Sequence, residues 1–557
     1  MPEPSKRDFK TPADHEDAVL ADQDELQLGS PSVTLILSAP RELRRDADLH
    51  IFQKKLGYKQ QLHRSWNLIE SFAASFCALC SKFHRRCQVV DPPFVFRASL
   101  TFCRSALFLG LLAGGPAAIC GSIYIWAAES AGSKDGRFFG FVVAWWSCTA
   151  WMTFAAGNCQ TTANYIVSQL AVWEVDFPGG ISNDSVKWRA LIWAISEALL
   201  VLSVAINYLP PRMYSAIFRF SVAFIMLDFF LCVIWLPIGV SKTYGFRSAK
   251  DVFTSTCEFF VADAYHHPTC ASDNGTGAPP GWNWILCFLF TAGTLTGFDA
   301  SGHIAEETKM RGKGILTSAL ATGVLGFLAS ILFLFCIPDL DTLFALEAPQ
   351  PFVLVYALAL GKGGSIFMTI VAVIGLMLNT SVTIVVASRL VYAVARDGVL
   401  PLSSWISKVT ADGQPQTAVT VIFVFAAALL CTILPSQVAF TSLVSAGAVP
   451  TIAAYGLIAL LRLTFTPNDF QSSHFRLGRL AKPFYACAVL FNALDFQVMI
   501  SPFSFPVDGQ TFNFACVIFG AVTIFGIASW YFTPEDKWLR RELVLQALHA
   551  SEEIKEE

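Results

Sequence analysis

The chain has 557 residues, of which 54% are apolar and only 15% are charged, whereas a soluble protein carries about a quarter charged residues. This composition excludes an ordinary soluble protein. The net charge of −3 is too small to predict nucleic acid or any other highly charged partner.

Charged residues gather at the two ends of the chain. Residues 1–65 hold 21 of them and residues 533–557 hold 11, which leaves 49 in the 467 residues between. At ~20 apolar residues per membrane-spanning helix, this middle part has room for about a dozen spans. Its apolar runs are continuous, which favours helices over the alternating strands of a membrane barrel. We therefore predict an all-α polytopic membrane protein with a disordered cytoplasmic tail over 1–65, a transmembrane domain over 66–532 and a cytoplasmic tail over 533–557.

The apolar runs predict about 11–12 spans. The first two are doubtful, because 66–80 is short for a bilayer and 105–128 is interrupted by Gly114, Gly115 and Pro116. Ten clear runs follow at 138–170, 189–208, 214–241, 282–300, 315–338, 365–390, 417–434, 438–462, 484–504 and 511–532.

Lys and Arg residues predict the orientation of the spans. With both termini inside and twelve crossings, thirteen basic residues after residue 128 fall on inside loops and six on outside loops, in agreement with the positive-inside bias. Asn183 and Asn274 begin possible glycosylation sequons on the outside. The five basic residues between 82 and 104 run against the bias.

The segment from Gly293 to Lys309 contains glycines, an acid and a histidine at the edge of an apolar run. Gly and a charged group are costly in a membrane helix, so the segment can be a broken helix that lines a cavity and binds a charged or zwitterionic solute. Alternatively, the span ends near Phe298 and the following residues lie at the interface. The residues themselves do not choose between these interpretations.

A resemblance to a known family favours the broken helix. The sequence FDASGHIAEETK at 298–309 resembles the hallmark of the fungal amino-acid/choline transporter branch, which includes GABA and choline permeases, of the amino acid/polyamine/organocation superfamily. Further matches follow the same order: LGYKQ at 56–60, GGP at 114–116, ARDGVLP at 395–401 and FRLGR at 475–479. Together they cover about residues 54–540.

The resemblance implies a transporter domain of two inverted five-helix repeats whose first and sixth helices are broken at the substrate site. It places the candidate substrate-binding residues in the sixth helix: Gly297, Phe298, Asp299, Ala300, Ser301 and Gly302. Asp299 would pair with a substrate amine or carry a coupling proton.

Other ionisable residues in apolar surroundings are candidates for a gate or for coupling. These are His303, Glu306, Glu70 and Glu197, of which His303 and Glu306 are expected at a cytoplasmic gate rather than as direct ligands. Asp228 and Asp495 also lie in apolar runs. For an acid of this kind the ordinary alternative is an interhelical hydrogen bond or a position at the end of a span.

Cysteine and histidine positions do not lead us to predict a metal site or a cofactor. Cys77, Cys80, His84 and Cys87 have a spacing suggestive of zinc, but two of the cysteines lie in an apolar run. Cys257 and Cys270 share a polar loop and form a disulfide only if the loop faces an oxidising space; otherwise they are free thiols.

The chain departs from the resembled family in its first repeat. Residues 80–104 interrupt the first helix, the second helix has no counterpart, and 253–272 resemble an insertion. Our hypothesis is an incorrectly spliced gene model; the alternative is a genuine variant in which 105–128 serves as the second crossing.

The prediction is a permease: a secondary active transporter for amino acids or related small amines, working by alternating access and, by family resemblance, coupled to protons. We expect it in the plasma membrane rather than the vacuolar membrane. The alternative is a nutrient sensor of the same fold that binds its solute without transporting it. We predict no enzymatic activity, because no catalytic constellation is visible.

Overall fold

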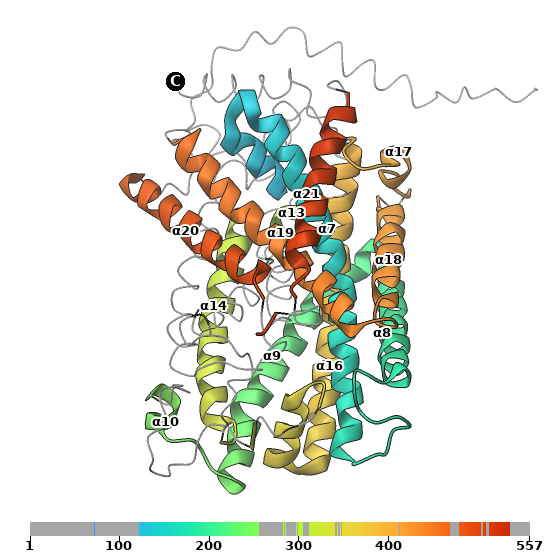
Figure 1. Cartoon of the computed structure of the whole chain (residues 1–557), viewed down its shortest axis with the longest axis vertical. Coiled ribbons are helices and arrows are strands. Elements are labelled where there is room, and N and C mark those ends of the chain that lie inside the picture. Colours follow the sequence, from blue (N-terminus) through green and yellow to red (C-terminus); the bar gives the residue numbers. More distant parts are fainter. Residues whose placement is uncertain are drawn as a thin grey trace, which may run out of the picture. The chain divides into compact units, whose positions relative to one another are not determined.

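Every regular element in the described part of the chain is a helix (Figure 1). The computed structural model describes residues 122–254, 299–304, 311–339, 348–467 except 412, 478–502 and 512–534, together with the separate positions 72, 282, 285, 297, 342, 343, 346 and 505–507. The helices are α7 (Ile123–Val172), α8 (Val186–Ile206), α9 (Pro211–Lys242), α10 (Ala249–Thr254), α13 (Ala300–His303), α14 (Arg311–Cys336), α16 (Pro351–Arg396), α17 (Ser403–Ile406), α18 (Gln416–Cys431), α19 (Gln437–Thr464), α20 (Ala481–Ile500) and α21 (Ala515–Phe532), with a 3₁₀ turn η3 at Gly478–Leu480.

The helices confirm the prediction of a multi-span helical membrane protein. Nine of the ten clear apolar runs coincide with α7, α8, α9, α14, α16, α18, α19, α20 and α21. Among the described residues, seven helices are long and apolar enough to cross a bilayer, while α18 and the apolar part of α14 are shorter. Nearly all of both predicted tails, most of the two doubtful spans and most of 282–300 lie outside the described residues, so the total of 11–12 spans and the altered first repeat stay predictions. The end of the doubtful span 105–128 forms the first turns of α7.

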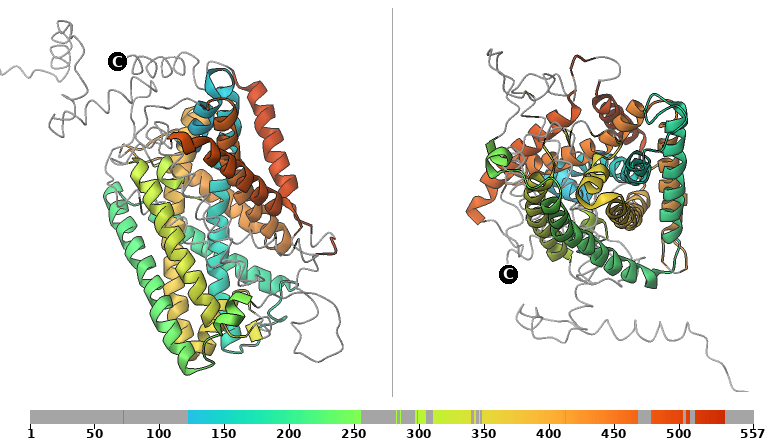
Figure 2. Two further views of the ribbon diagram at one scale, coloured as in Figure 1. Left: turned by 90° about the vertical axis from the view of Figure 1, so that its left-hand side faces the viewer. Right: turned by 90° about the horizontal axis from the view of Figure 1, so that it is seen from below.

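Helices α7 and α16 form the centre of this bundle. Helix α7 packs against α8, α16, α18, α19 and α21, and most of its spanning part is buried, as is most of α16. Figure 2 shows these two helices surrounded by others in the view from below. By contrast, α9 and α21 expose apolar side chains such as Phe230, Ile234 and Ile524. Such side chains suit contact with lipid, which cannot hydrogen-bond a polar group.

Two glycines interrupt the long helices α7 and α16. Gly132 (φ 77°) separates the first turns of α7 from its spanning part, and Gly361 (φ 76°) divides α16 into a helix over 351–360 and a long helix over 362–396. The short helix packs on α9 and α14, where Phe352 contacts Phe333 edge to face with ring centroids 5.3 Å apart. The sequence prediction of 365–390 missed this short helix.

Loops predicted on opposite sides of the membrane lie at opposite ends of the bundle. Helix α10 lies at one end, and α17 lies at the other (Figure 1). Helix α16 ends at Arg396, and Gly398 follows with φ 81°, a left-handed conformation that commonly terminates a helix at glycine.

Candidate functional site

Asp299 lies in a turn at the start of a short helix. It precedes the four-residue helix α13, and Gly297, two residues earlier, has φ 112°, a left-handed conformation that glycine adopts without strain. Ile304 ends α13, and α14 begins at Arg311. This geometry fits the broken helix expected here, although residues 286–296 and 305–310 lie outside the described part.

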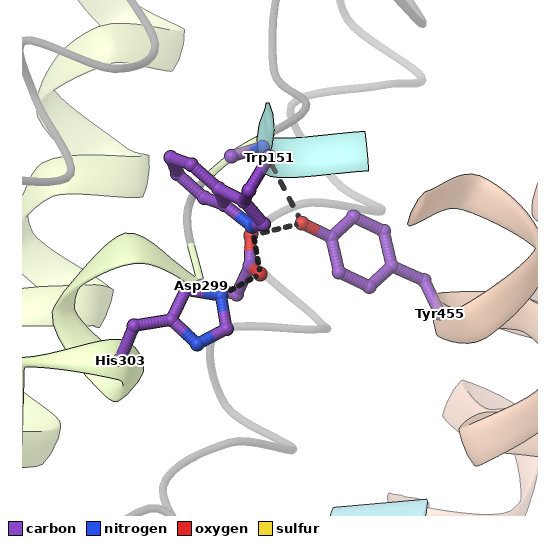
Figure 3. Close-up of polar contacts among 5 residues, drawn as sticks. Trp151, Asp299, His303 and Tyr455 are labelled. Atoms are coloured by element: carbon purple, nitrogen blue, oxygen red, sulfur yellow. Dashed lines mark hydrogen bonds and ion pairs between the residues drawn. The ribbon is translucent and has the colours of Figure 1, made fainter. Parts of the chain in front are cut away.

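Three side chains from three helices surround the Asp299 carboxylate (Figure 3). Trp151 of α7 donates from Nε1 to Oδ2 at 3.2 Å, and Tyr455 of α19 donates from its hydroxyl to Oδ1 at 2.5 Å. His303, one turn further along α13, places Nε2 2.8 Å from Oδ2. Because a carboxylate only accepts hydrogen bonds, Nε2 carries the proton in this pair.

This cluster of Trp151, Asp299, His303 and Tyr455, called the Asp299 cluster below, is closed to solvent. Asp299 is 1% exposed and His303 is 5% exposed. A buried carboxylate is costly unless donors satisfy it, and here three donors do so. The carboxylate can therefore keep a negative charge inside the bundle, where it attracts a cation strongly.

Tyr455 also fixes the backbone at the start of the segment. Its hydroxyl oxygen accepts from the Gly297 amide at 3.3 Å while its hydrogen is donated to Asp299. One side chain of α19 thus binds both the turn at Gly297 and the acid that follows it.

The cluster also contains aromatic ring contacts and the second ring nitrogen of His303. Trp151 packs edge to face against the His303 ring with centroids 5.2 Å apart, and against Phe154 at 5.6 Å. The second ring nitrogen of His303, Nδ1, is buried and has no hydrogen-bond partner among the described residues. In the neutral imidazole this nitrogen is an acceptor, so it can receive a donor from a bound solute.

A second polar pair lies two turns along α7 from Trp151. Asn158 donates from Nδ2 to Oδ1 of Asn379 on α16 at 3.0 Å, and both residues are buried. Residues seven apart on a helix share a face, so Trp151 and Asn158 lie on the same side of α7. Such a bond contributes about 0.6 kcal/mol to helix association in a membrane.

The predicted site residues divide into three groups. Gly297, Asp299 and His303 meet in the cluster, and the buried backbone of Ala300 and Gly302 lies beside it, with the Gly302 amide donating to the Asp299 carbonyl at 2.8 Å. Phe298, Glu306, Glu70 and the side chain of Ser301 lie outside the described residues, as do the cysteine and histidine groups at 77–87 and 257–270.

Glu197 lies apart from the Asp299 cluster. It belongs to α8 and contacts Cys431 at the end of α18, with 4.0 Å between Oε1 and Sγ. Asp228 forms no interhelical hydrogen bond with a described residue; the Cys232 thiol of the same helix lies 4.0 Å from its Oδ1.

Sequence reasoning missed Trp151 and Tyr455. Trp151 belongs to an α7 run rich in tryptophan, and Tyr455 is a single tyrosine beside Gly456 in an apolar run. A hydroxyl in such a run signals a polar partner, but the sequence does not say that the partner is 156 residues away.

Comparison with known proteins agrees with this geometry. Residues 95–522 match the family described as Amino acid permease. The thiamine transporter thi9 of Schizosaccharomyces pombe is 43% identical, with 87% of this chain and 86% of that protein covered. The amino-acid permease BAT1 homolog of Oryza sativa subsp. japonica is 28% identical, covering 86% of this chain and 93% of that protein. A putative polyamine transporter of Candida albicans is 24% identical and covers 87% of each chain.

The family match extends over most of the chain, from before α7 into α21, and includes the whole Asp299 cluster. The chain therefore belongs to the amino acid permease family, and it is a multi-pass membrane transporter rather than an enzyme.

Proposed function

We propose that this protein is a secondary active transporter for thiamine or a closely related cationic nitrogen compound, working by alternating access and coupled to protons. The observation that carries the proposal is the 43% identity with the fission yeast thiamine transporter over 87% of the chain. Among the relatives named above, the amino-acid permease and the polyamine transporter are less similar, at 28% and 24%.

The chemistry of the Asp299 cluster supports a cationic solute. Thiamine has a quaternary thiazolium nitrogen, which keeps a positive charge and has no hydrogen to donate. Such a cation is attracted by a carboxylate and by aromatic faces rather than by hydrogen-bond acceptors alone. Asp299, Trp151 and Tyr455 supply these two features in one buried place.

We assign the substrate site to Gly297, Phe298, Asp299, Ala300, Ser301 and Gly302, and add the rings of Trp151 and Tyr455. The open Nδ1 of His303 suits the exocyclic amine of the aminopyrimidine ring, which donates hydrogen bonds. Glu306 and Glu70 keep their predicted part in a gate or in coupling.

Uptake of labelled thiamine tests the proposal. The full chain is expressed in yeast cells that lack their own thiamine uptake, and accumulation is measured with and without a protonophore. We expect accumulation that the protonophore abolishes and that excess unlabelled thiamine blocks. Excess GABA, choline, spermidine or a neutral amino acid should leave it unchanged.

Two other results would replace the substrate proposal. Accumulation of an amino acid, choline or a polyamine instead of thiamine would support the amino-acid or amine permease, and with it the GABA and choline branch. Saturable binding of thiamine without accumulation would support a nutrient sensor of the same fold.

The proposed location is the plasma membrane. A fluorescent tag on the carboxyl end should give signal at the cell surface, and signal at the vacuolar rim would contradict this. Uptake by whole cells is meaningful only in the first case.

A further inference from the structure

A second acid inside the bundle, Asp495, has surroundings opposite to those of Asp299. It belongs to α20 and is 1% exposed. Both carboxyl oxygens are buried, and neither has a hydrogen-bond partner among the described residues. Within that part of the chain, Asp495 lacks the interhelical hydrogen bond that is the ordinary explanation for such an acid.

The neighbours of Asp495 on its own helix do not satisfy it. Asn492, one turn earlier, donates from Nδ2 to the Ala488 carbonyl at 2.8 Å. Val498, one turn later, packs in an apolar cluster with Trp282 and Phe505. The environment on this side is apolar.

Among the described residues, the titratable side chains on the elements that pack against α20 form no hydrogen bond with the Asp495 carboxyl group. On α19, the Tyr455 hydroxyl donates to Asp299, and Arg462 donates to Thr466. The remaining titratable side chains of the described elements here are Lys482, Tyr485 and Cys487 on α20, Arg479 in η3, and Cys516 and Tyr531 on α21. None of them forms a hydrogen bond with either Asp495 oxygen.

If Asp495 were ionised, no hydrogen-bond donor of a described residue would stabilise its negative charge. Burying an unpaired charge costs several kcal/mol, whereas a protonated carboxyl is neutral and costs much less. The Asp495 carboxyl therefore carries a proton in the conformation described here. A conformation that admits water or a donor to α20 would release it.

Helix α20 is in close contact with the helix that completes the Asp299 cluster. A Cβ at Gly456 of α19 would lie 3.2 Å from Cβ of Asn492, so the two backbones approach closely there. Gly456 directly follows Tyr455, the donor to Asp299. A movement of α20 is therefore passed to the Asp299 cluster through a tightly packed contact.

We propose that Asp495 is a proton-binding site of the transport cycle, protonated in the conformation described here and ionised in another, and that α20 links its protonation to the Asp299 cluster through α19. This inference rests on the proposed proton coupling and names the group that performs it.

Infrared difference spectroscopy tests the protonation without any solute. The full-length protein in lipid vesicles is titrated with base, and the C=O band of protonated carboxyl groups is compared between wild type and Asp495→Asn. We expect part of the band to disappear on titration in wild type and in Asp299→Asn, and to be missing from the start in Asp495→Asn. A band that is identical in wild type and Asp495→Asn would overturn the proposal, as would a band that does not change with pH.

Proton movement tests the link to transport. Vesicles that contain a pH-sensitive dye are given thiamine outside, and proton entry is measured beside exchange of labelled for unlabelled thiamine. Asp495→Asn should lose proton entry and keep exchange, whereas the exposed-loop control Asp176→Asn should keep both. Proton entry in Asp495→Asn equal to wild type would overturn the inference.

The two experiments separate the possible failures. If the wild-type protein moves no thiamine, the proposed substrate is wrong, while the infrared titration still decides whether Asp495 binds a proton. If the wild type moves thiamine without protons, proton coupling and the role of Asp495 both fail.

Discussion

The Asp299 carboxylate depends on donors from three helices, so each donor can be removed separately. A hydrogen bond to a charged group contributes about 1.5–3 kcal/mol, and the three bonds here fix both oxygens of the acid. The charge of this one side chain is therefore the property that substitutions should test first.

Asp299→Asn is expected to lower thiamine uptake by at least about tenfold, because 1.4 kcal/mol corresponds to a factor of ten and the variant removes the charge. It also turns an amide N–H toward one of the donors. Uptake is measured at equal amounts of protein in the membrane, with Asp176→Asn, an exposed acid in the loop after α7, as the control. Uptake equal to wild type would remove Asp299 from the proposed site.

Tyr455→Phe removes one oxygen that has two partners. The Gly297 amide and the Asp299 carboxylate then each lose a hydrogen bond, and an unsatisfied buried group costs about 1–3 kcal/mol. We expect KM for thiamine to rise about tenfold, while the protein still reaches the membrane. Tyr531→Phe, at a tyrosine that is 80% exposed, is the matched control. The same KM in both variants would show that Tyr455 does not hold the site.

The residues of the site differ in how far the sequence predicted them. Gly297, Asp299 and His303 follow one another in a segment whose composition is unusual for a membrane helix, so a local pattern was enough. Trp151 and Tyr455 reach Asp299 across 148 and 156 residues. A tryptophan or tyrosine in an apolar run looks like ordinary membrane packing, and only the folded arrangement gives it a partner.

At the scale of the helices, the apolar runs predicted where the spans lie but not where the backbone breaks. Continuous runs of about 20 residues mark spans well, because each span must be apolar along its length. The break at Gly361 lies between two apolar helices, so hydropathy does not mark it. The turns of α7 before Gly132 belong in part to the predicted run 105–128, which the structure joins to the predicted run 138–170 in one helix with a break at Gly132.

The contact between α7 and α19 gives a prediction about packing. A Cβ at Gly447 would lie 2.8 Å from the Thr153 side chain on α7, closer than atoms in contact can be. Gly447→Ala should therefore lower the thermal unfolding midpoint of the purified protein, since overpacking costs about 1–3 kcal/mol. Gly520→Ala in α21 is the matched control, because nothing lies within 4 Å of a Cβ there. An equal midpoint in the two variants would contradict the close packing of α7 and α19.

The direction of the bundle in the membrane is open to a chemical test. The loop between α7 and α8 lies at the end of the bundle opposite α17 (Figure 1), and Asn183 in this loop is exposed. We expect this asparagine to carry a glycan that an endoglycosidase removes and that Asn183→Gln lacks. A sequon introduced beside Lys408 at the other end should stay unmodified. Modification at Lys408 and not at Asn183 would reverse the assigned orientation.

The hydrogen bond between Tyr455 and Gly297 bears on which solutes the protein accepts. The Gly297 amide is a backbone donor at the turn before α13, and a phenol oxygen already occupies it. A solute that brings a carboxylate to this amide must first displace the phenol, which also frees Asp299 from one of its donors. A cation that approaches the Asp299 carboxylate displaces nothing from the amide. If the proposed site is correct, we expect the same bond that fixes the turn to discriminate against zwitterions and in favour of solutes that carry positive charge alone.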